Sequence, residues 1–294
     1  MPEVKEFNTS YKPTWCPGCG NFGMFESLKR ALAELGWEKN QFTMFWGIGC
    51  HGNGADFWDV QGFHALHGRS LPPASAFALT RPDQKVIVHM GDGDGYGLGI
   101  GHLLHAIRRN QNITCIVHDN QIYGLTTGQA SPTTDRLMKT VSTPAGVLEQ
   151  PVNPIGLALA EGGSFVARGF AGDMPHLTDL YKQALDHEGF SLVDVYQPCV
   201  TWNKINTFKW FRERVYKLEE SGWDPTDRTA AFDLSLSAFH DLNCAPESCR
   251  IPLGVYYRST EQATYESGIT ASQTPGWRRA EEPRDISGLL LQFS

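Results

Sequence analysis

The stretch GDGDGYGLGIG, residues 91–101, follows an apolar run at residues 86–90 and continues into a predicted helix at residues 98–109. Glycines in such a turn let backbone N–H groups approach an anion, and the N-terminus of the following helix adds a favourable dipole. No register of the stretch gives the G-x-G-x-x-G pattern of a dinucleotide fold, and no P-loop pattern is present. The sequence therefore predicts a phosphate site of another kind at the end of a strand.

The aspartates of this turn set it apart, because a carboxylate facing a phosphate is repulsive unless a cation lies between them. The pair Asp119-Asn120 follows the next strand, and Asn120 comes 28 residues after Asp92. A carboxylate from Asp92, the amide oxygen of Asn120 and a backbone carbonyl such as that of Ile122 are ligands that Mg²⁺ prefers. We expect these three residues to hold Mg²⁺, which would bridge to a diphosphate. The alternative is a flexible glycine loop beside an ordinary strand-end turn.

Helix and strand signals alternate over the first two hundred residues. Helical patterns occur at residues 22–35, 71–79, 98–109, 155–161 and 175–187, and the apolar runs typical of strands occur at residues 42–46, 86–90, 113–118, 165–167 and 192–196. This order predicts an α/β fold with a mostly parallel sheet and helices on both faces, in which ligands bind at the carboxyl ends of the strands. We expect one cofactor-binding domain at residues 1–205. Residues 206–294 lack the alternation and are expected to form an extended C-terminal tail, packed on this core or on a partner subunit.

Composition excludes several classes of protein. The 294 residues are 41% hydrophobic and 19% charged, which suits a packed core, and the net charge of −7 argues against a general nucleic-acid binder. No run approaches the ~18 apolar residues of a membrane span. The polar start does not read as a secretory signal. Seven cysteines, an odd number, then favour a reducing compartment, the cytoplasm, where thiols pack, react or bind metal.

Four of the cysteines are predicted to meet at one rim of the sheet. Cys16 and Cys19 form a knuckle in WCPGCG, Cys50 follows the first strand, and Cys199 follows the last strand of the core. Four thiolates suit either structural zinc or a [4Fe–4S] cluster, and their spacing does not separate the two. Cys115 lies mid-strand and is expected to pack in the core. Cys244 and Cys249 are expected to be spare thiols in the tail.

Gly-Asp-Gly followed after this interval by Asn resembles the signature of thiamine diphosphate enzymes. More narrowly, GDGDG at residues 91–95 and DNQIYGLT at residues 119–126 resemble the β subunits of 2-oxoacid:ferredoxin oxidoreductases, over roughly residues 10–210. The resemblance implies the thiamine diphosphate-binding fold and a [4Fe–4S] cluster on Cys16, Cys19, Cys50 and Cys199. It favours the cluster over zinc, because oxidation of a decarboxylated 2-oxoacid requires a one-electron relay.

The resemblance also implies a set of cofactor contacts around the turn. These residues are Ile48, Gly49, Cys50, His51, His67, Gly93, Asp94, Gly124 and Leu125. No catalytic residue is assigned to the chain, because the glutamate that activates the thiamine is expected from an α subunit. The implied partners are that α subunit, in a heterodimer or a dimer of heterodimers, together with ferredoxin, coenzyme A and a 2-oxoacid. Thr127 stands where some relatives have Lys, so the cation for the substrate carboxylate is not assigned to this chain.

The string GFHALHGRSLP, residues 62–72, looks most like the 2-oxoglutarate branch of the family. The implied reaction is the reversible oxidative decarboxylation of 2-oxoglutarate to succinyl-CoA and CO₂, with electrons passing to ferredoxin. Pyruvate or another 2-oxoacid is the first alternative. A non-redox thiamine diphosphate decarboxylase or synthase would leave the four cysteines unused, and a zinc-stabilised scaffold subunit would leave the spacing of Asp92 and Asn120 unexplained.

Overall fold

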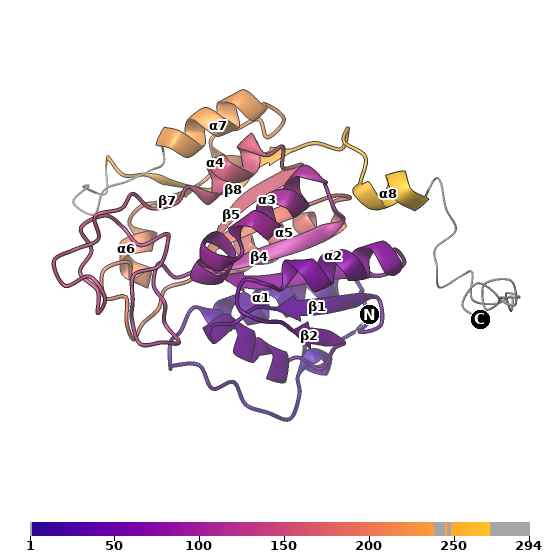
Figure 1. Ribbon diagram of the computed structural model, residues 1–294, viewed down its shortest axis with the longest axis horizontal. Helices are drawn as coiled ribbons and strands as arrows, with labels where there is room; N and C mark the ends of the chain where they lie inside the picture. Colours follow the sequence, from indigo (N-terminus) through magenta and orange to yellow (C-terminus); the bar gives the residue numbers. More distant parts are fainter. Residues whose placement is uncertain (1, 238–244, 246–247, 271–294) are drawn as a thin grey trace, which may run out of the picture.

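The computed structural model describes residues 2–237, 245 and 248–270, and their strands form one eight-stranded sheet (Figure 1). The strand order across the sheet is β2-β1-β3-β4-β6-β5-β8-β7. Neighbours are parallel except β5 and β8, which are antiparallel. The bounds are β1 Phe42–Trp46, β2 Gly62–His64, β3 Lys85–Gly91, β4 Ile113–Asp119, β5 Phe165–Phe170, β6 Ser191–Tyr196, β7 Val215–Lys217 and β8 Ile251–Arg258.

Helices cover both faces of this sheet (Figure 1). The α-helices are α1 Asn21–Glu34, α2 Leu71–Thr80, α3 Ile100–Arg108, α4 Pro154–Ala160, α5 Met174–Asp186, α6 Phe208–Arg212, α7 Arg228–Ser237 and α8 Tyr265–Thr270. Short 3₁₀ segments are η1 Val4–Phe7, η2 Cys50–Asp56 and η4 Leu218–Glu220, and η3 Gly93–Leu98 is a π-helical turn. The glycine-rich stretch thus enters α3 through a widened turn, a form that is frequent at functional sites.

Alternate residues of the central strands feed two separate cores. Val86 and Val88 pack with α2, α3 and α4 on one face, whereas Ile87 packs with α1 and α5 on the other. Because successive side chains of a strand point to opposite faces, a strand covered by helices on both sides is buried along its whole length. All residues of β1 and β4 are buried for this reason. The predicted α/β class, with a mostly parallel sheet between helices, is confirmed.

The chain after residue 205 is more regular than an extended tail. It packs on the core, and β8 pairs with β5 inside the main sheet, with Ala167 opposite Val255. The sequence of β8, IPLGVYYR, contains Pro252 and Gly254, which argue against a strand in the absence of tertiary information. The division of the chain at residue 205 stays a prediction. Among the described residues, no helix combines the length and the apolar character needed to cross a membrane.

The cysteines outside the predicted cluster fall in two environments. Cys115 is fully buried in β4, so its predicted place in the core is confirmed. Cys249 is fully buried and disulfide-bonded, so the prediction of a spare thiol is wrong for this residue. Cys244 lies outside the described residues.

Candidate cofactor site

A cleft of about 450 Å³, including its solvent-filled mouth, opens beside the glycine-rich turn at the carboxyl ends of β1, β3 and β4. All nine expected cofactor contacts line it, and Asp92 and Asn120 line it as well. Gly91, Tyr123 and Thr126 complete the lining and were not predicted. The sheet therefore brings together segments separated by about 75 residues of sequence, as expected where parallel strands end at one edge.

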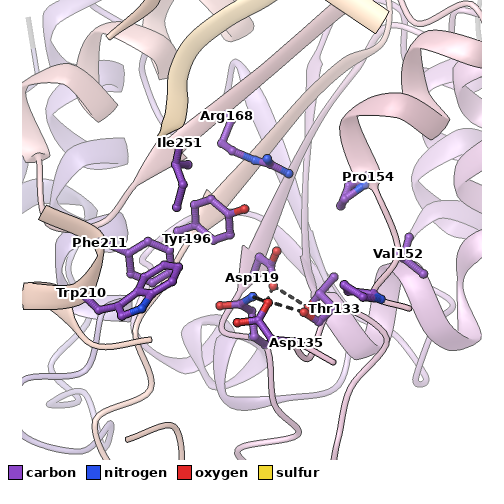
Figure 2. Close-up of a pocket in the computed structure, with 12 residues that line it drawn as sticks. Asp119, Thr133, Asp135, Val152, Pro154, Arg168, Tyr196, Trp210, Phe211 and Ile251 are labelled. Carbon is purple, nitrogen blue, oxygen red and sulfur yellow. Dashed lines mark hydrogen bonds between the residues drawn. The ribbon is translucent and has the colours of Figure 1, made fainter. Parts of the chain in front are cut away.

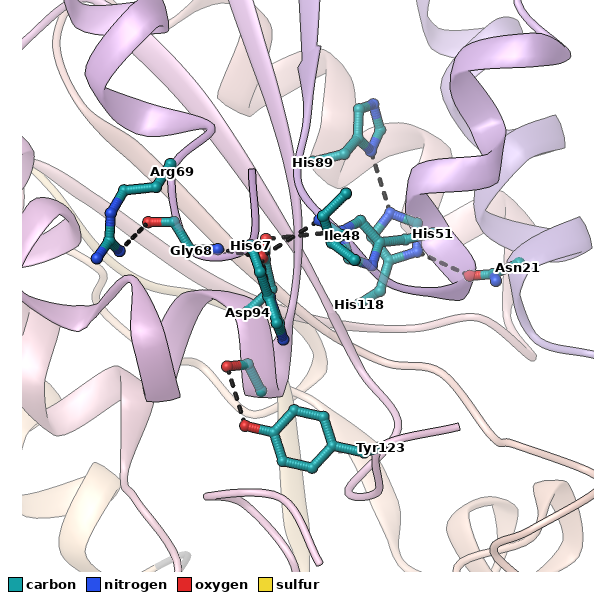
Figure 3. Close-up of polar contacts among 11 residues, drawn as sticks. Asn21, Ile48, His51, His67, Gly68, Arg69, His89, Asp94, His118 and Tyr123 are labelled. Carbon is teal, nitrogen blue, oxygen red and sulfur yellow. Dashed lines mark hydrogen bonds and ion pairs between the residues drawn. The ribbon is translucent and has the colours of Figure 1, made fainter. Parts of the chain in front are cut away.

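Asp94 holds the loops of this cleft together (Figure 3). Its Oδ1 accepts hydrogen bonds from the backbone N–H of Gly68 at 2.5 Å, from Nδ1 of His67 at 2.7 Å and from the backbone N–H of Ile48 at 3.3 Å. Its Oδ2 lies 3.7 Å from Nε2 of His51. Burial acts to raise the pKa of Asp94, but the nearby His51 ring and the donors of Gly68 and His67 outweigh it and lower the pKa. The Asp94 side chain is 1% exposed, and through these bonds it fastens the loops that form the cleft to each other.

The close approach of Asp94 requires glycine at residue 47. A Cβ on Gly47 would lie 1.8 Å from Oδ2 of Asp94, well inside van der Waals contact. We expect Gly47→Ala to displace Asp94 and to weaken cofactor binding, with a loss of about 1–3 kcal/mol of stability from overpacking. Gly101→Ala is the matched control, because nothing lies within 4 Å of its Cβ position in α3. Thermal unfolding and cofactor titration of both variants check this, and equal behaviour would contradict it.

Asp92 is buried at the base of the cleft and is held by two hydroxyl groups. Its Oδ2 accepts hydrogen bonds from Oγ of Ser131 at 2.5 Å and from Oγ1 of Thr133 at 2.7 Å. Burial raises the pKa of Asp92 to about 6, although both hydroxyl donors and the N–H of Gly93 oppose this. A buried carboxylate whose charge is only partly compensated favours a bound cation, which fits the predicted Mg²⁺ site.

Thr133 joins Asp92 to a second buried carboxyl. Its Oγ1 also lies 2.7 Å from Oδ1 of Asp119, and a single hydroxyl hydrogen serves only one of the two acceptors. Burial and the negative charges of Asp194 and Asp92 raise the pKa of Asp119 well above its usual range. The arrangement is satisfied when Asp119 carries a proton and Asp92 is ionised.

The consecutive residues Asp119 and Asn120 face different cavities. Asn120 lines the cleft, whereas Asp119 lines a second cavity of about 490 Å³ beside Arg168, Tyr196 and Trp210 (Figure 2). Oδ1 of Asn120 accepts the backbone N–H of Ile122 at 3.0 Å, which fixes the orientation of the amide. Ile122 is buried and does not line the cleft; it packs with Met138 and Cys199. Its predicted role as a carbonyl ligand of Mg²⁺ stays a prediction.

The four predicted cluster cysteines converge beside the cleft. A Cβ on Gly124 would lie 3.5 Å from Sγ of Cys199 and 3.6 Å from Sγ of Cys50. Cys19 interacts electrostatically with all three other thiols. Burial, followed by repulsion among the thiols, raises the pKa of Cys19 to about 12 and that of Cys50 to about 11.

Hydrogen bonds tie the loops that carry these thiols to each other. The backbone N–H of Gly20 donates to the carbonyl of Pro198 at 3.2 Å, and Nε1 of Trp15 donates to the carbonyl of Cys50 at 2.6 Å. Nε2 of Gln197 donates to Sγ of Cys19 at 3.3 Å. The knuckle, the Cys50 loop and the Cys199 loop are therefore held together by the chain itself.

The donor sets fit the implied cofactors. Among the described residues, no three His, Cys, Asp or Glu side chains close on the position of a single metal ion. One carboxylate, one amide and a diphosphate would hold Mg²⁺ without such a triad. A four-iron cluster is larger than one ion, so its thiolates stand further apart than the four ligands of zinc.

Several buried polar residues near the site could not be predicted from the sequence, because they contact residues far away along the chain. Nδ1 of His118 donates to Oδ1 of Asn21 at 2.8 Å, and Nδ1 of His89 lies 3.0 Å from Nε2 of His118 (Figure 3). Asn21 follows the knuckle directly, so this buried chain connects the knuckle to β3 and β4. The contacts of Ser131 and Thr133 with Asp92 were not predicted. No sequence signal marked His89 or His118.

Comparison with known proteins supports the geometric assignment. Residues 41–195 match the family described as "Thiamine pyrophosphate enzyme, C-terminal TPP binding domain". Residues 199–273 match the family of the C-terminal part of the pyruvate ferredoxin oxidoreductase beta subunits. Fold and cleft together define a thiamine diphosphate-binding α/β protein.

Individual relatives place the chain more narrowly within the thiamine diphosphate-binding proteins. The chain is 42% identical over 276 residues to the 2-oxoacid:ferredoxin oxidoreductase subunit beta of Saccharolobus solfataricus, covering 92% of this chain and 90% of that one. It is 37% identical over 226 residues to the 2-oxoglutarate synthase subunit KorB of Archaeoglobus fulgidus, covering 74% and 84%. A solved structure of the 2-oxoglutarate:ferredoxin oxidoreductase from Magnetococcus marinus, "with 2-oxoglutarate, coenzyme A and succinyl-CoA bound", matches at a TM-score of 0.87 and 34% identity, over 100% of this chain and 96% of that one.

The chain belongs to the β subunits of the 2-oxoacid:ferredoxin oxidoreductases. The predicted family is thereby confirmed. The chain is an enzyme subunit, and the β-subunit names of its relatives imply an α subunit as partner.

Proposed function

We propose that this chain, with its α subunit, catalyses the reversible oxidative decarboxylation of 2-oxoglutarate to succinyl-CoA and CO₂, with ferredoxin as the electron acceptor. One observation carries the proposal: Cys50 both lines the cleft and lies with Cys199 beside Gly124, so a cofactor in the cleft would adjoin the thiol group. A redox centre next to a thiamine site is what the oxidation requires. We place the reaction in the cytoplasm, which suits the four free thiols expected to hold the cluster.

The residues would divide the binding of the cofactors. Asp92 and Asn120, with a backbone carbonyl such as that of Ile122, would hold Mg²⁺, and the cleft contacts named above would hold thiamine diphosphate. Cys16, Cys19, Cys50 and Cys199 would hold a [4Fe–4S] cluster. When bound, these groups supply an electron sink for decarboxylation and a one-electron relay. The protein's own part is to fix the loops through Asp94 and to keep Asp92 buried and ionised beside the cation.

The substrate assignment rests on the 2-oxoglutarate synthase relatives and on the bound molecules named for the Magnetococcus marinus structure. No Lys or Arg occurs among the residues that line the cleft. Cations for the two carboxylates of 2-oxoglutarate would therefore come from the α subunit or from outside the cleft. Pyruvate and other 2-oxoacids remain the alternative substrates.

An anaerobic preparation of the chain with its α subunit tests the proposal. We expect brown protein with broad absorbance near 400 nm, bound thiamine diphosphate, and coenzyme A-dependent reduction of ferredoxin that is faster with 2-oxoglutarate than with pyruvate. The chain alone should show no 2-oxoacid-dependent dye reduction. Colourless protein with stoichiometric zinc would favour a scaffold subunit, and decarboxylation without electron transfer would favour a non-redox enzyme.

A further inference from the structure

His67 is held by Asp94 in an orientation that fixes which ring nitrogen carries the hydrogen. Oδ1 of Asp94 accepts two backbone N–H groups, from Gly68 and Ile48, so this oxygen acts as an acceptor. Nδ1 of His67 lies 2.7 Å from the same oxygen. Nδ1 must therefore be the donor, and neutral His67 is the Nδ1–H tautomer with a bare lone pair on Nε2.

That tautomer is the wrong one for binding an anion. His67 lines the cleft, and its side chain is 33% exposed there. A diphosphate oxygen is a hydrogen-bond acceptor, and the Nε2 of the neutral ring is an acceptor as well. Only the imidazolium offers a hydrogen on Nε2 while it keeps the bond from Nδ1 to Asp94.

We propose that Asp94 is a positioning residue that fixes the tautomer of His67, so that binding of the thiamine diphosphate phosphates takes up one proton on Nε2 of His67. This inference rests on the proposed function, because it requires a diphosphate in the cleft. No bond other than the new N–H forms or breaks, and the proton comes from solvent.

The groups that face His67 in the cleft are two carboxyl groups and a phenol. Asp94 of η3 supplies the buried carboxylate, Asp92 lies at the base of the same cleft, and Tyr123 presents its ring at 6.2 Å. Burial, and then the charges of Asp92 and Asp94, raise the pKa of Tyr123, which therefore stays neutral.

The other basic side chains nearby are directed elsewhere. His51 approaches Asp94 from η2, and the Arg69 guanidinium donates to the carbonyls of Gly68 and Leu98. No Lys or Arg lines the cleft, and its other imidazole, His51, faces Asp94, so a charged His67 would add positive charge where a diphosphate is expected.

Nitrogen NMR of the full chain, labelled with ¹⁵N-histidine, reads the tautomer directly. We expect the His67 resonances, assigned by their absence in His67→Gln, to show the Nδ1–H form at about pH 8, above the usual histidine pKa. An Nε2–H form at His67 would overturn the inference without bearing on the proposed function.

Calorimetry on the complex with the α subunit, after its cofactors have been removed, measures the number of protons taken up when thiamine diphosphate binds. Thiamine diphosphate is titrated with saturating Mg²⁺ at about pH 8, where its diphosphate is ionised, in two buffers of different ionisation enthalpy. We expect uptake of about one proton per cofactor in wild type and close to none in His67→Gln, and an affinity that falls about tenfold per pH unit only in wild type.

His67→Gln controls for protons taken up by the cofactor itself, because glutamine does not titrate. Equal proton uptake in the two proteins would overturn the inference while leaving the proposed function intact. Failure of both proteins to bind thiamine diphosphate would instead refute the proposed function, and this inference with it. Asp94→Asn keeps an acceptor oxygen but loses the negative charge. In this variant the coupling between proton uptake and thiamine diphosphate binding should occur at lower pH.

Discussion

Replacing Asp92 with Asn is expected to weaken retention of Mg²⁺ and thiamine diphosphate by at least about a hundredfold, because the change removes the carboxylate expected to bind the cation directly. The iron–sulfur cluster should remain, since the cysteines lie on other loops. Asn fits the site, because its amide oxygen still accepts from Ser131 and Thr133. Bound thiamine diphosphate and iron are measured on the same anaerobic preparation.

The pKa of Asp92 predicts the direction in which stability and cofactor retention change with pH. Its pKa in the folded chain is raised to about 6 from 3.8, so the folded state without cation holds the proton more tightly than the unfolded state. The contribution of Asp92 to the stability of the cofactor-free chain is therefore fully present below about pH 4 and is lost as the pH rises through about 6. Cation binding requires the ionised form of Asp92. Cofactor retention should therefore show the opposite pH dependence and decrease as the pH is lowered below about 6.

Two variants test whether Asp92 causes both of these pH trends. Asp92→Asn should lose both trends, while Asp59→Asn should keep them, because Asp59 is 60% exposed and pairs on the surface with Lys39. Unfolding midpoints of the cofactor-free chains and cofactor retention from about pH 5 to 8 measure the two trends. Unchanged cofactor content in Asp92→Asn would place the cation elsewhere.

Local sequence signals were sufficient for the parallel sheet and for the position of the cleft. The run FTMFW is apolar throughout except for one threonine, and the structure shows it as β1, buried on both faces. The glycine-rich turn follows β3 directly, and parallel strands end at one edge. The residues after β1, β3 and β4 therefore had to meet, and all nine expected cofactor contacts line one cleft.

What could not be predicted depends on contacts between distant segments. Ser131 and Thr133 hold Asp92 across about 40 residues of sequence, and no pattern in a loop of hydroxyl residues specifies that partner. The strand β8 was missed because Pro252 and Gly254 weaken its local signal, whereas pairing with β5 stabilises it. Asp94 lines the cleft as expected, but no local pattern indicated that its side chain also fastens three loops.

Replacing Cys199 with Ala is expected to remove most of the absorbance near 400 nm and to lower electron transfer to ferredoxin at least about a hundredfold, because three thiolates leave one iron of a four-iron cluster without its protein ligand. Thiamine diphosphate should stay bound, since Cys199 does not line the cleft. Iron, acid-labile sulfide and bound thiamine diphosphate are measured in this variant beside Asp92→Asn.

Cys115→Ala is the matched control for the loss of the cluster. The Cys115 thiol is also removed from solvent but packs in β4, so its loss should cost stability and leave the colour unchanged. Opposite losses in Asp92→Asn and Cys199→Ala would establish two separately filled sites that meet at Cys50. Joint loss of both cofactors in each variant would contradict that arrangement and would mean that neither site forms without the other.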